Sequence, residues 1–449
     1  MADPVDPHRI EFAWSVSLYK LALAFITLSA IASAEVRQLT LQQTLEIAAR
    51  QNPDVTLARL DEQRAGQGVK VAIDPFRPKI YGGSGLAETY GYPNSIDGSA
   101  PSLFQLKTDM ALYDRPKRLR VASAREGARG SQFAAQAKAD EVAYQAADLF
   151  LTASRTTHQR ETISGQLPSL QRVVESMSAA VNEGSELPLE LSRARVNLAI
   201  SEERLSSAKL DQDYYEMMLA VLLGYPASDR VQPVDSDLSQ TPTPPSEEEA
   251  ADMALRNNRD LKQMQSNVLA KELDVRSYKS EKYPKVNLVA QYALFAKYNY
   301  VNYFQKFQRN NFQIGASITI PLVTGSAAAG LALQTYTDMQ KIRVQMDQVR
   351  NRIITDTRRS YEVWEKAENI RNLSRMQLDL ARQELTVLLA QNSEGRVLLS
   401  KVEQARLDEG DRWLALYDAE TQVTRAKLAI LRQMGTLLAV IRGGASATP

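Results

Sequence analysis

Residues Gly395 to Gly435 read GRVLLSKVEQARLDEGDRWLALYDAETQVTRAKLAILRQMG, and this stretch decides the fold. A second stretch of the same length, Gly184 to Gly224, reads GSELPLELSRARVNLAISEERLSSAKLDQDYYEMMLAVLLG. At a constant offset of 211 positions, the matched pairs are Leu187 with Leu398, Ala194 with Ala405, Arg195 with Arg406, Leu205 with Leu416, and Ala208 with Ala419. Each copy predicts one long helix bounded by glycines. Because similarity at a fixed offset marks an internal repeat, we predict one structural unit written twice.

The repeat extends upstream of both stretches. Leu39 to Asp74 predicts a helix with Thr40 as its N-cap, and Pro53 is expected to bend or restart that helix. Residues Ser246 to Pro284 match this block at an offset of 206 and open with a predicted capping box, Ser246 to Glu249. Each half therefore begins with a helix that ends at a proline.

Alternating apolar and polar residues follow each proline. Lys285 to Tyr298 and Asn311 to Leu322 place apolar side chains at even positions, which predicts strands with one apolar face. In the first half, Phe104 to Leu112 alternates more weakly, and Tyr81 to Tyr90 is rich in glycine. The pattern predicts four strands, each near the ~9–11 residues that cross a bilayer.

These strands have two interpretations. One is a soluble sheet that packs its apolar face on a helix. Tyrosines at the strand ends, among them Tyr81, Tyr90, Tyr292 and Tyr298, favour the other, a membrane sheet with an interfacial aromatic girdle. Because four strands are fewer than the roughly eight that close a membrane barrel, the membrane interpretation requires an oligomer.

Long helices are predicted to follow each strand pair, over Asp114 to Asn182 and Gly325 to Asn392. Pro168 predicts a kink in the first copy only. A glycine turn then reverses each chain into its return helix. The second return helix has one apolar seam and a partial second one, which favours a neighbour on each side and hence a wall of helices closed into a tube. A plain elongated bundle is the alternative.

The remaining segments complete the expected organisation. Leu21 to Ala34 is an apolar run after Arg9 and Lys20, which predicts a secretory leader cleaved after Ala34, with a short membrane anchor as the alternative. We expect no lipoprotein, since the chain has no cysteine to acylate. The expected boundaries are a signal peptide over 1–34, a first repeat over 35–224 (strands about 79–113, helical hairpin about 114–224), a proline-rich connector over 225–245, a second repeat over 246–435 (strands about 285–322, helical hairpin about 325–435) and a C-terminal tail over 436–449.

Composition argues against several classes of function. The 54 basic and 53 acidic residues give a formal net charge of +1, which does not favour nucleic-acid binding. Only His8 and His158 are present and cysteine is absent, so no imidazole-rich or thiolate metal site is expected. The chain also lacks a nucleophile–base motif and a phosphate loop. We expect no enzyme activity and no cofactor.

The order of leader, helix, proline, strand pair, long helix, glycine turn and return helix, with all but the leader written twice, resembles the TolC-type outer-membrane efflux duct family. The resemblance covers Leu39 to Gly435. It implies a mainly α protein with transmembrane β-structure: a homotrimer whose twelve strands form an outer-membrane barrel on a periplasmic tunnel of twelve long helices. It also implies work with a periplasmic adaptor protein and an inner-membrane pump.

The resemblance assigns roles to two groups of residues. The predicted adaptor-contact tips are Glu183, Gly184, Ser185, Glu394, Gly395 and Arg396. Both glycines also fit a helix C-cap with positive φ. The predicted periplasmic constriction contains Glu190, Arg193, Lys401 and Gln404, where the family often has acidic residues. We therefore expect a mixed-charge constriction with weak or altered ion preference.

The function predicted is the exit duct of a tripartite export system that passes drugs or toxic small molecules out of the cell. A type I protein secretion duct is the alternative within this class. A trimeric coiled-coil surface adhesin or a periplasmic structural protein is the alternative outside it. Lys297, Lys306 and Arg309 are expected in an extracellular loop, where they either meet lipopolysaccharide phosphates or are simply solvated.

Overall fold

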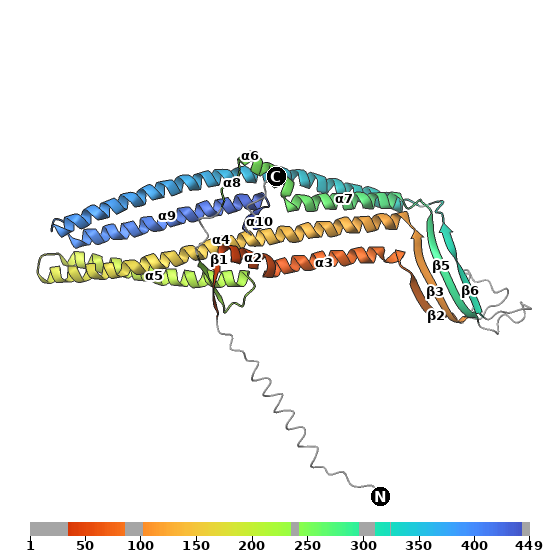
Figure 1. Cartoon of the computed structure of the whole chain (residues 1–449), viewed down its shortest axis with the longest axis horizontal. Coiled ribbons are helices and arrows are strands. Elements are labelled where there is room, and N and C mark those ends of the chain that lie inside the picture. The colour runs from red at the N-terminus through yellow and green to blue at the C-terminus, as the bar shows by residue number, and fades with distance from the viewer. Residues whose placement is uncertain (1–34, 86–101, 235–241, 296–309, 324, 442–449) are drawn as a thin grey trace, which may run out of the picture. The chain divides into compact units, whose positions relative to one another are not determined.

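The computed structural model describes residues 35–85, 102–234, 242–295, 310–323 and 325–441. The expected signal peptide, the loop with Lys297, Lys306 and Arg309, and the last eight residues lie outside the described parts. In chain order the elements are β1 (Val36–Thr40), α2 (Leu41–Gln51), α3 (Pro53–Ile73), η1 (Asp74–Phe76), β2 (Lys79–Gly85), β3 (Ser102–Tyr113), α4 (Arg115–Asn182), α5 (Pro188–Leu222), β4 (Arg230–Val234), α6 (Glu247–Asn257), α7 (Arg259–Lys279), β5 (Lys285–Phe295), β6 (Asn310–Thr319), α8 (Ala327–Ser393), α9 (Leu399–Gln433) and α10 (Leu437–Ile441), labelled where there is room in Figure 1.

The chain divides into two compact units. The first contains residues 1–52, 143–242 and 364–427, and the second contains residues 53–142, 243–363 and 428–449. The first unit therefore holds the glycine turns, and the second holds the β2–β3–β5–β6 sheet with the helix ends next to it.

A short break interrupts the helix that opens each half. Thr40 forms the full capping box with Gln43 at the start of α2. Asn52 then leaves the helical conformation (φ −55°, ψ 135°) and Pro53 begins α3, as the sequence predicts. Asn258 takes nearly the same conformation (φ −56°, ψ 122°) between α6 and α7. A proline is therefore not needed for the second break, because the Asn258 side chain caps α7 by accepting from the Leu261 N–H.

Ser246 starts α6 by accepting a hydrogen bond from the Glu249 N–H, as predicted for this N-cap. The segment just before it lies against α8, because the Tyr361 hydroxyl donates to the Pro245 carbonyl at 2.5 Å. The short length of this bond indicates a firm attachment of the end of the connector. Burial, with the nearby charges of Glu247 and Glu249, raises the pKa of Tyr361 to about 12.

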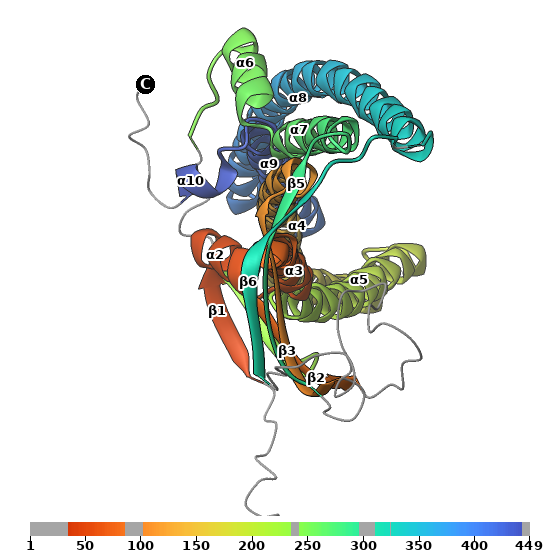
Figure 2. The same cartoon turned by 90° about the vertical axis from the view of Figure 1, so that its right-hand side faces the viewer.

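The four predicted strands form one antiparallel sheet in the order β2–β3–β5–β6, seen in the foreground of Figure 2. The register places even-numbered residues opposite one another, so a single row contains Met110, Leu288 and Ala316. Side chains alternate between the two faces of a strand, so the predicted apolar face is continuous across the sheet. This face is open, with Phe312 and Ile314 exposed by 68% and 67%.

The polar face of the sheet carries the odd-numbered residues. Gln105, Lys107 and Asp109 of β3 lie opposite Ala293, Gln291 and Val289 of β5. The outer strands β2 and β6 each have one neighbour within the chain. The described sheet thus has two edges that offer unpaired backbone groups and one exposed apolar face.

The long helices confirm the predicted hairpins. α4 and α8 contain 68 and 67 residues, and both return helices, α5 and α9, contain 35. Asp114 directly precedes α4, and its side chain accepts from the Lys117 N–H at 3.0 Å and caps the helix. α4 continues through Pro168 as one helix, and the predicted kink at that residue stays a prediction.

The predicted apolar seam of α9 is buried along the part of the helix in the first unit. Val402, Ala419, Val423 and Ala426 are each less than 5% exposed. By contrast, α5 keeps an apolar stripe at the surface, and so does the part of α8 in the first unit. The exposed stripe residues are Leu189, Val196, Ile200, Leu210 and Tyr214 of α5, and Ile370, Leu373, Leu380 and Val387 of α8. The described parts of the chain do not cover these two helix faces.

The sequence did not predict the strand pair of β1 with β4, nor the helix α10. Residues 230–234 of the expected connector form β4, which pairs in parallel with β1 from Val36↔Arg230 to Thr40↔Val234. The start of the expected C-terminal tail forms α10, in which Leu437 is fully buried. The connector and the tail are therefore partly structured rather than irregular throughout.

Candidate functional site

Glycine ends both long helices at the predicted tips. Gly184 and Gly395 have φ values of +74° and +71°, a region that L-residues with a side chain avoid. After α4, the Ser185 N–H donates to the Ala180 carbonyl and the Gly184 N–H to the Val181 carbonyl. After α8, Arg396 and Gly395 make the same pair of bonds. This is the Schellman arrangement, so the predicted C-cap role of both glycines is confirmed.

The two turns differ in charge. In the turn after α8, the Arg396 guanidinium lies 3.1 Å from the Glu394 carboxylate. In the turn after α4, the Ser185 hydroxyl bonds back to the Ala180 carbonyl at 2.9 Å, and Glu183 has no basic partner among the described residues. The first turn is therefore more negative than the second, and a charged binding partner would bind the two turns with different affinities.

Exposed leucines lie beside both turns. Leu187 and Leu189 are 65% and 55% exposed, and Leu398 after the second turn is 58% exposed. Pro188 is the first residue of α5, a position for which the fixed φ of proline is well suited. Five residues separate it from the end of α4. Each turn thus presents a glycine without a side chain, at least one leucine and a few polar groups.

Three of the four predicted constriction residues come together near these turns. Glu190, Arg193 and Gln404 line one pocket of about 350 Å³, whose walls come from α4, α5 and α9. The Glu190 and Arg193 side chains form an ion pair at 2.7 Å. Lys401 is exposed and does not line this pocket, although it lies only one helical turn from Gln404. The polar lining of this pocket therefore combines a carboxylate and a guanidinium, and the constriction itself stays a prediction.

The sequence reasoning missed Glu403, which also lines this pocket. Glu403 is 3% exposed, and its carboxylate lies 3.5 Å from the Arg406 and 3.8 Å from the Arg172 guanidinium. These distances exceed the roughly 2.7–2.9 Å of a strong charge-assisted hydrogen bond. The sequence did contain a sign of this burial, because Glu403 directly follows Val402 of the apolar seam. A residue next to a seam position lies at the edge of the buried face of the helix.

Polar contacts hold α4 against α9 farther from the turns, within the first unit. The Arg155 guanidinium donates two hydrogen bonds to the Asp418 carboxylate, at 2.6 and 3.0 Å. This bond to Asp418 raises the pKa of Arg155. Gly410 of α9 faces the Gln166 side chain of α4, whose amide end would have to move if position 410 carried a Cβ. The helices consequently pack closely along this length.

Among the described ranges, no group of three His, Cys, Asp or Glu residues could hold a metal ion. His158 packs against the Trp413 and Tyr417 rings, with centroids 5.7 and 4.2 Å away. In the part of the chain that the structure describes, no helix is both long and apolar enough to cross a membrane.

Comparison with known proteins adds the family. The model of the outer membrane efflux protein family matches residues 44–225 and 250–436. No curated protein matches the sequence significantly.

Solved structures of outer-membrane channels have the same fold. The outer membrane protein VceC of Vibrio cholerae is 16% identical, with a TM-score of 0.70 and coverage of 88% of this chain and 96% of that one. The CmeC outer membrane channel of Campylobacter jejuni is 12% identical, with a TM-score of 0.69 and coverage of 88% and 86%. The open state of the MtrE outer membrane channel of Neisseria gonorrhoeae is 14% identical, with a TM-score of 0.62 and coverage of 89% of each chain.

The family model accounts for both halves of the chain, each from the helix that opens it to the glycine that ends its return helix. Members of this family are TolC-type channels of the outer membrane with a long helical tunnel in the periplasm. The chain therefore belongs to the outer membrane efflux protein family.

Proposed function

We propose that this protein is the exit duct of a tripartite export system and that it passes small molecules from the periplasm to the exterior. The observation that carries the proposal is the four-stranded sheet, whose apolar face is exposed and whose outer strands β2 and β6 have no second neighbour among the described residues. Open strand edges are not tolerated in lipid, so three copies that join their sheets into a twelve-stranded barrel satisfy both features.

The long helices support the same assembly. The exposed apolar residues of α5 and α8 recur at steps of three, four or seven residues, apart from one step of ten between Ile200 and Leu210, and such spacing suits packing on a further helix. Three duplicated chains would contribute α4, α5, α8 and α9 three times each and would form a tunnel of twelve helices. The stripes of one copy would then lie against the next copy and leave water.

In this proposal the two glycine turns are the periplasmic tips that contact the adaptor protein. Their exposed leucines and unlike charges support two unequal contact sites per chain. The residues Glu190, Arg193, Lys401 and Gln404 form the narrow end of the tunnel and mix both signs of charge. The duct itself performs no chemistry, so the pump supplies the energy of transport.

The test uses the absence of cysteine from the sequence. In Ser185→Cys the single thiol lies at the first turn, and a thiol-linked photocrosslinker in whole cells should capture a periplasmic adaptor protein that mass spectrometry identifies. Ser206→Cys is the matched control, because this exposed serine lies within α5 and away from the turn. Capture from both positions alike, or labelling of Ser185→Cys by a membrane-impermeant reagent outside the cell, would overturn the proposed topology.

A further inference from the structure

Basic residues are concentrated where the strands of the second unit join its helices. Five of them are named here the basic collar: Arg77, Arg115, Arg118, Lys279 and Lys282. Arg77 precedes β2, Arg115 and Arg118 open α4 directly after β3, and Lys279 and Lys282 lie between α7 and β5. All five are exposed. Since β3 pairs with both β2 and β5, these junctions meet at one end of the sheet.

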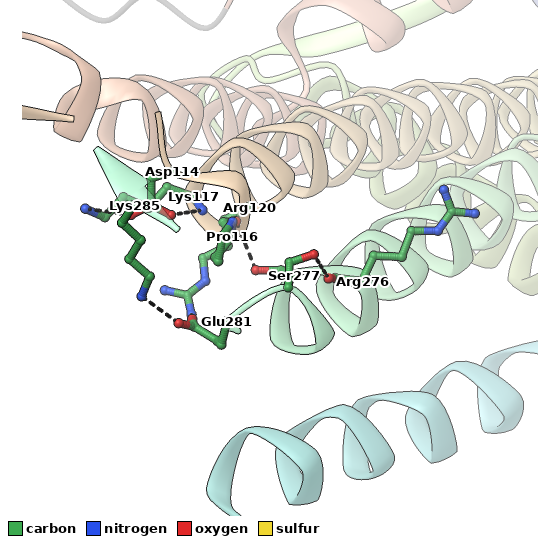
Figure 3. Close-up of polar contacts among 9 residues, drawn as sticks. Asp114, Pro116, Lys117, Arg120, Arg276, Ser277, Glu281 and Lys285 are labelled. Atoms are coloured by element: carbon green, nitrogen blue, oxygen red, sulfur yellow. Dashed lines mark hydrogen bonds and ion pairs between the residues drawn. The ribbon is translucent and has the colours of Figure 1, made fainter. Parts of the chain in front are cut away.

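The acidic residues of this region already have other partners. Asp114 pairs with Lys117 at 3.1 Å, and Glu281 pairs with both Arg120 at 3.2 Å and Lys285 at 2.8 Å, as Figure 3 shows. The Ser277 hydroxyl and the Pro116 carbonyl join the two junctions at 3.0 Å. Within the described ranges, no carboxylate lies within ion-pair distance of any residue of the basic collar.

The start of α4 makes this excess of positive charge unfavourable for the isolated chain. Its first six residues read RPKRLR, and its first turn contains no acidic residue. The positive end of a helix dipole disfavours cations, and the N-cap carboxylate of Asp114, which offsets the dipole, is also paired with Lys117. The basic collar therefore leaves a net positive charge at this end of the sheet among the described residues.

Tyrosine rings lie directly beneath two of these cations. The Arg115 guanidinium lies 4.6 Å from the centre of the Tyr283 ring, and the Arg118 guanidinium lies 5.2 Å from that of Tyr113. Tyrosine at the edge of a membrane-spanning sheet marks the level of the lipid headgroups. The exposed apolar face of the sheet begins next to them, with Ile80 72% exposed.

We propose that the basic collar binds the phosphate groups of anionic glycerophospholipids in the membrane leaflet from which the helices emerge. Guanidinium groups match phosphate oxygens with two parallel hydrogen bonds, and the lysines add point charges. The apolar face beside the collar accepts the acyl chains of the same lipids. The proposal rests on the outer-membrane location of the family and not on the export role, so failure of the export test leaves it intact.

The experiment measures lipid binding by the purified full-length protein in a neutral detergent. Native mass spectrometry would compare phosphatidylglycerol with phosphatidylcholine of the same acyl chains. We expect tighter binding of phosphatidylglycerol. In the triple variant Arg115→Gln, Arg118→Gln, Lys282→Gln we expect that preference to fall by roughly 100-fold, at about fivefold for each charge removed.

Two controls make the outcome decisive. The triple variant Arg352→Gln, Arg359→Gln, Lys366→Gln removes the same charge from exposed positions of α8 and should bind both lipids like the wild type. Inorganic phosphate at the same concentration should not displace the bound lipid. If the collar triple does not assemble, the single variant Arg115→Gln should still show a roughly fivefold loss. Equal binding of the two lipids, or equal losses in both triple variants, would overturn the proposal.

Discussion

Replacing Gly224 by alanine tests whether glycine is required after α5 by backbone conformation alone or also by the close contact with α2. Gly224 has a φ of +87°, and a Cβ at this position would lie 2.9 Å from the Gln51 carbonyl oxygen. Gly184 is the matched position, because it has a φ of +74° and the same pattern of hydrogen bonds, but a Cβ there meets nothing within 4 Å.

The two alanine substitutions should lower the free energy of unfolding by different amounts. A left-handed conformation costs an alanine about 1–2 kcal/mol, and this applies to both variants. At Gly224 the added atom also forces α5 and α2 apart, which costs a further ~1–3 kcal/mol by overpacking. That movement would stretch the 2.7 Å hydrogen bond from the Asn52 amide to the Leu222 carbonyl. We therefore expect losses of about 1–2 kcal/mol for Gly184→Ala and about 2–5 kcal/mol for Gly224→Ala.

Circular dichroism at increasing temperature would measure the effect on the purified protein. At about 2–4 °C for each kcal/mol, the midpoint should fall by about 2–8 °C in Gly184→Ala and about 4–20 °C in Gly224→Ala. Gly165→Ala, inside α4 and with open space around it, controls for the substitution itself and should be neutral or stabilising. Equal midpoints for the Gly184 and Gly224 variants would refute the close approach of α5 to α2.

Three further substitutions test other features of the structure. Burial raises the pKa of Glu216, so the folded state binds its proton more tightly than the unfolded state and loses stability as the pH rises through that pKa. Glu216→Gln should therefore have a higher melting temperature than the wild type at pH 7.5 and the same melting temperature at pH 4. A difference that does not depend on pH would contradict this reasoning. Tyr361→Phe removes the donor to the Pro245 carbonyl, which should lower the free energy of unfolding by about 1 kcal/mol. It should also speed cleavage by a glutamate-specific protease at the glutamates that follow Pro245. The control Tyr336→Phe changes an exposed tyrosine of the same helix and should have neither effect. Lys401→Glu should shift single-channel selectivity in planar bilayers toward cations, and unchanged selectivity would place Lys401 away from the conduction path.

Much of the fold could be predicted from the sequence because the signals are local. The Thr40 cap, the restart at Pro53 and the glycine turns each depend on residues within one helical turn of one another. The sheet was also predictable, since alternation along β5 and β6 places each side chain on a face without reference to the rest of the chain. The trimeric assembly was predicted from the family resemblance. The open sheet edges and exposed helix faces of a single chain support that assembly but do not show it.

The candidate site was predictable only in part. Gly184 and Gly395 are at helix ends as expected, and Glu190, Arg193 and Gln404 line one pocket. The offset from the tip glycine says how far along the helix a residue lies, but not which direction it faces once helices pack. That is why Lys401 was grouped with Gln404 although only Gln404 lines the pocket, and why the buried Glu403 between them was missed.

The sequence by itself determined the elements of this protein: where helices start, break and turn, and which face of each strand is apolar. It did so because capping, positive φ and side-chain alternation act over a few residues. Only the tertiary structure decided what meets across the chain. The parallel pairing of β1 with β4 joins residues 194 positions apart, the approach of Gly224 to Gln51 depends on how two helices dock, and the uncompensated charge of the basic collar appears only when three junctions meet. Such contacts follow from long-range packing, in which neighbours in space are distant in sequence, and no local pattern records them.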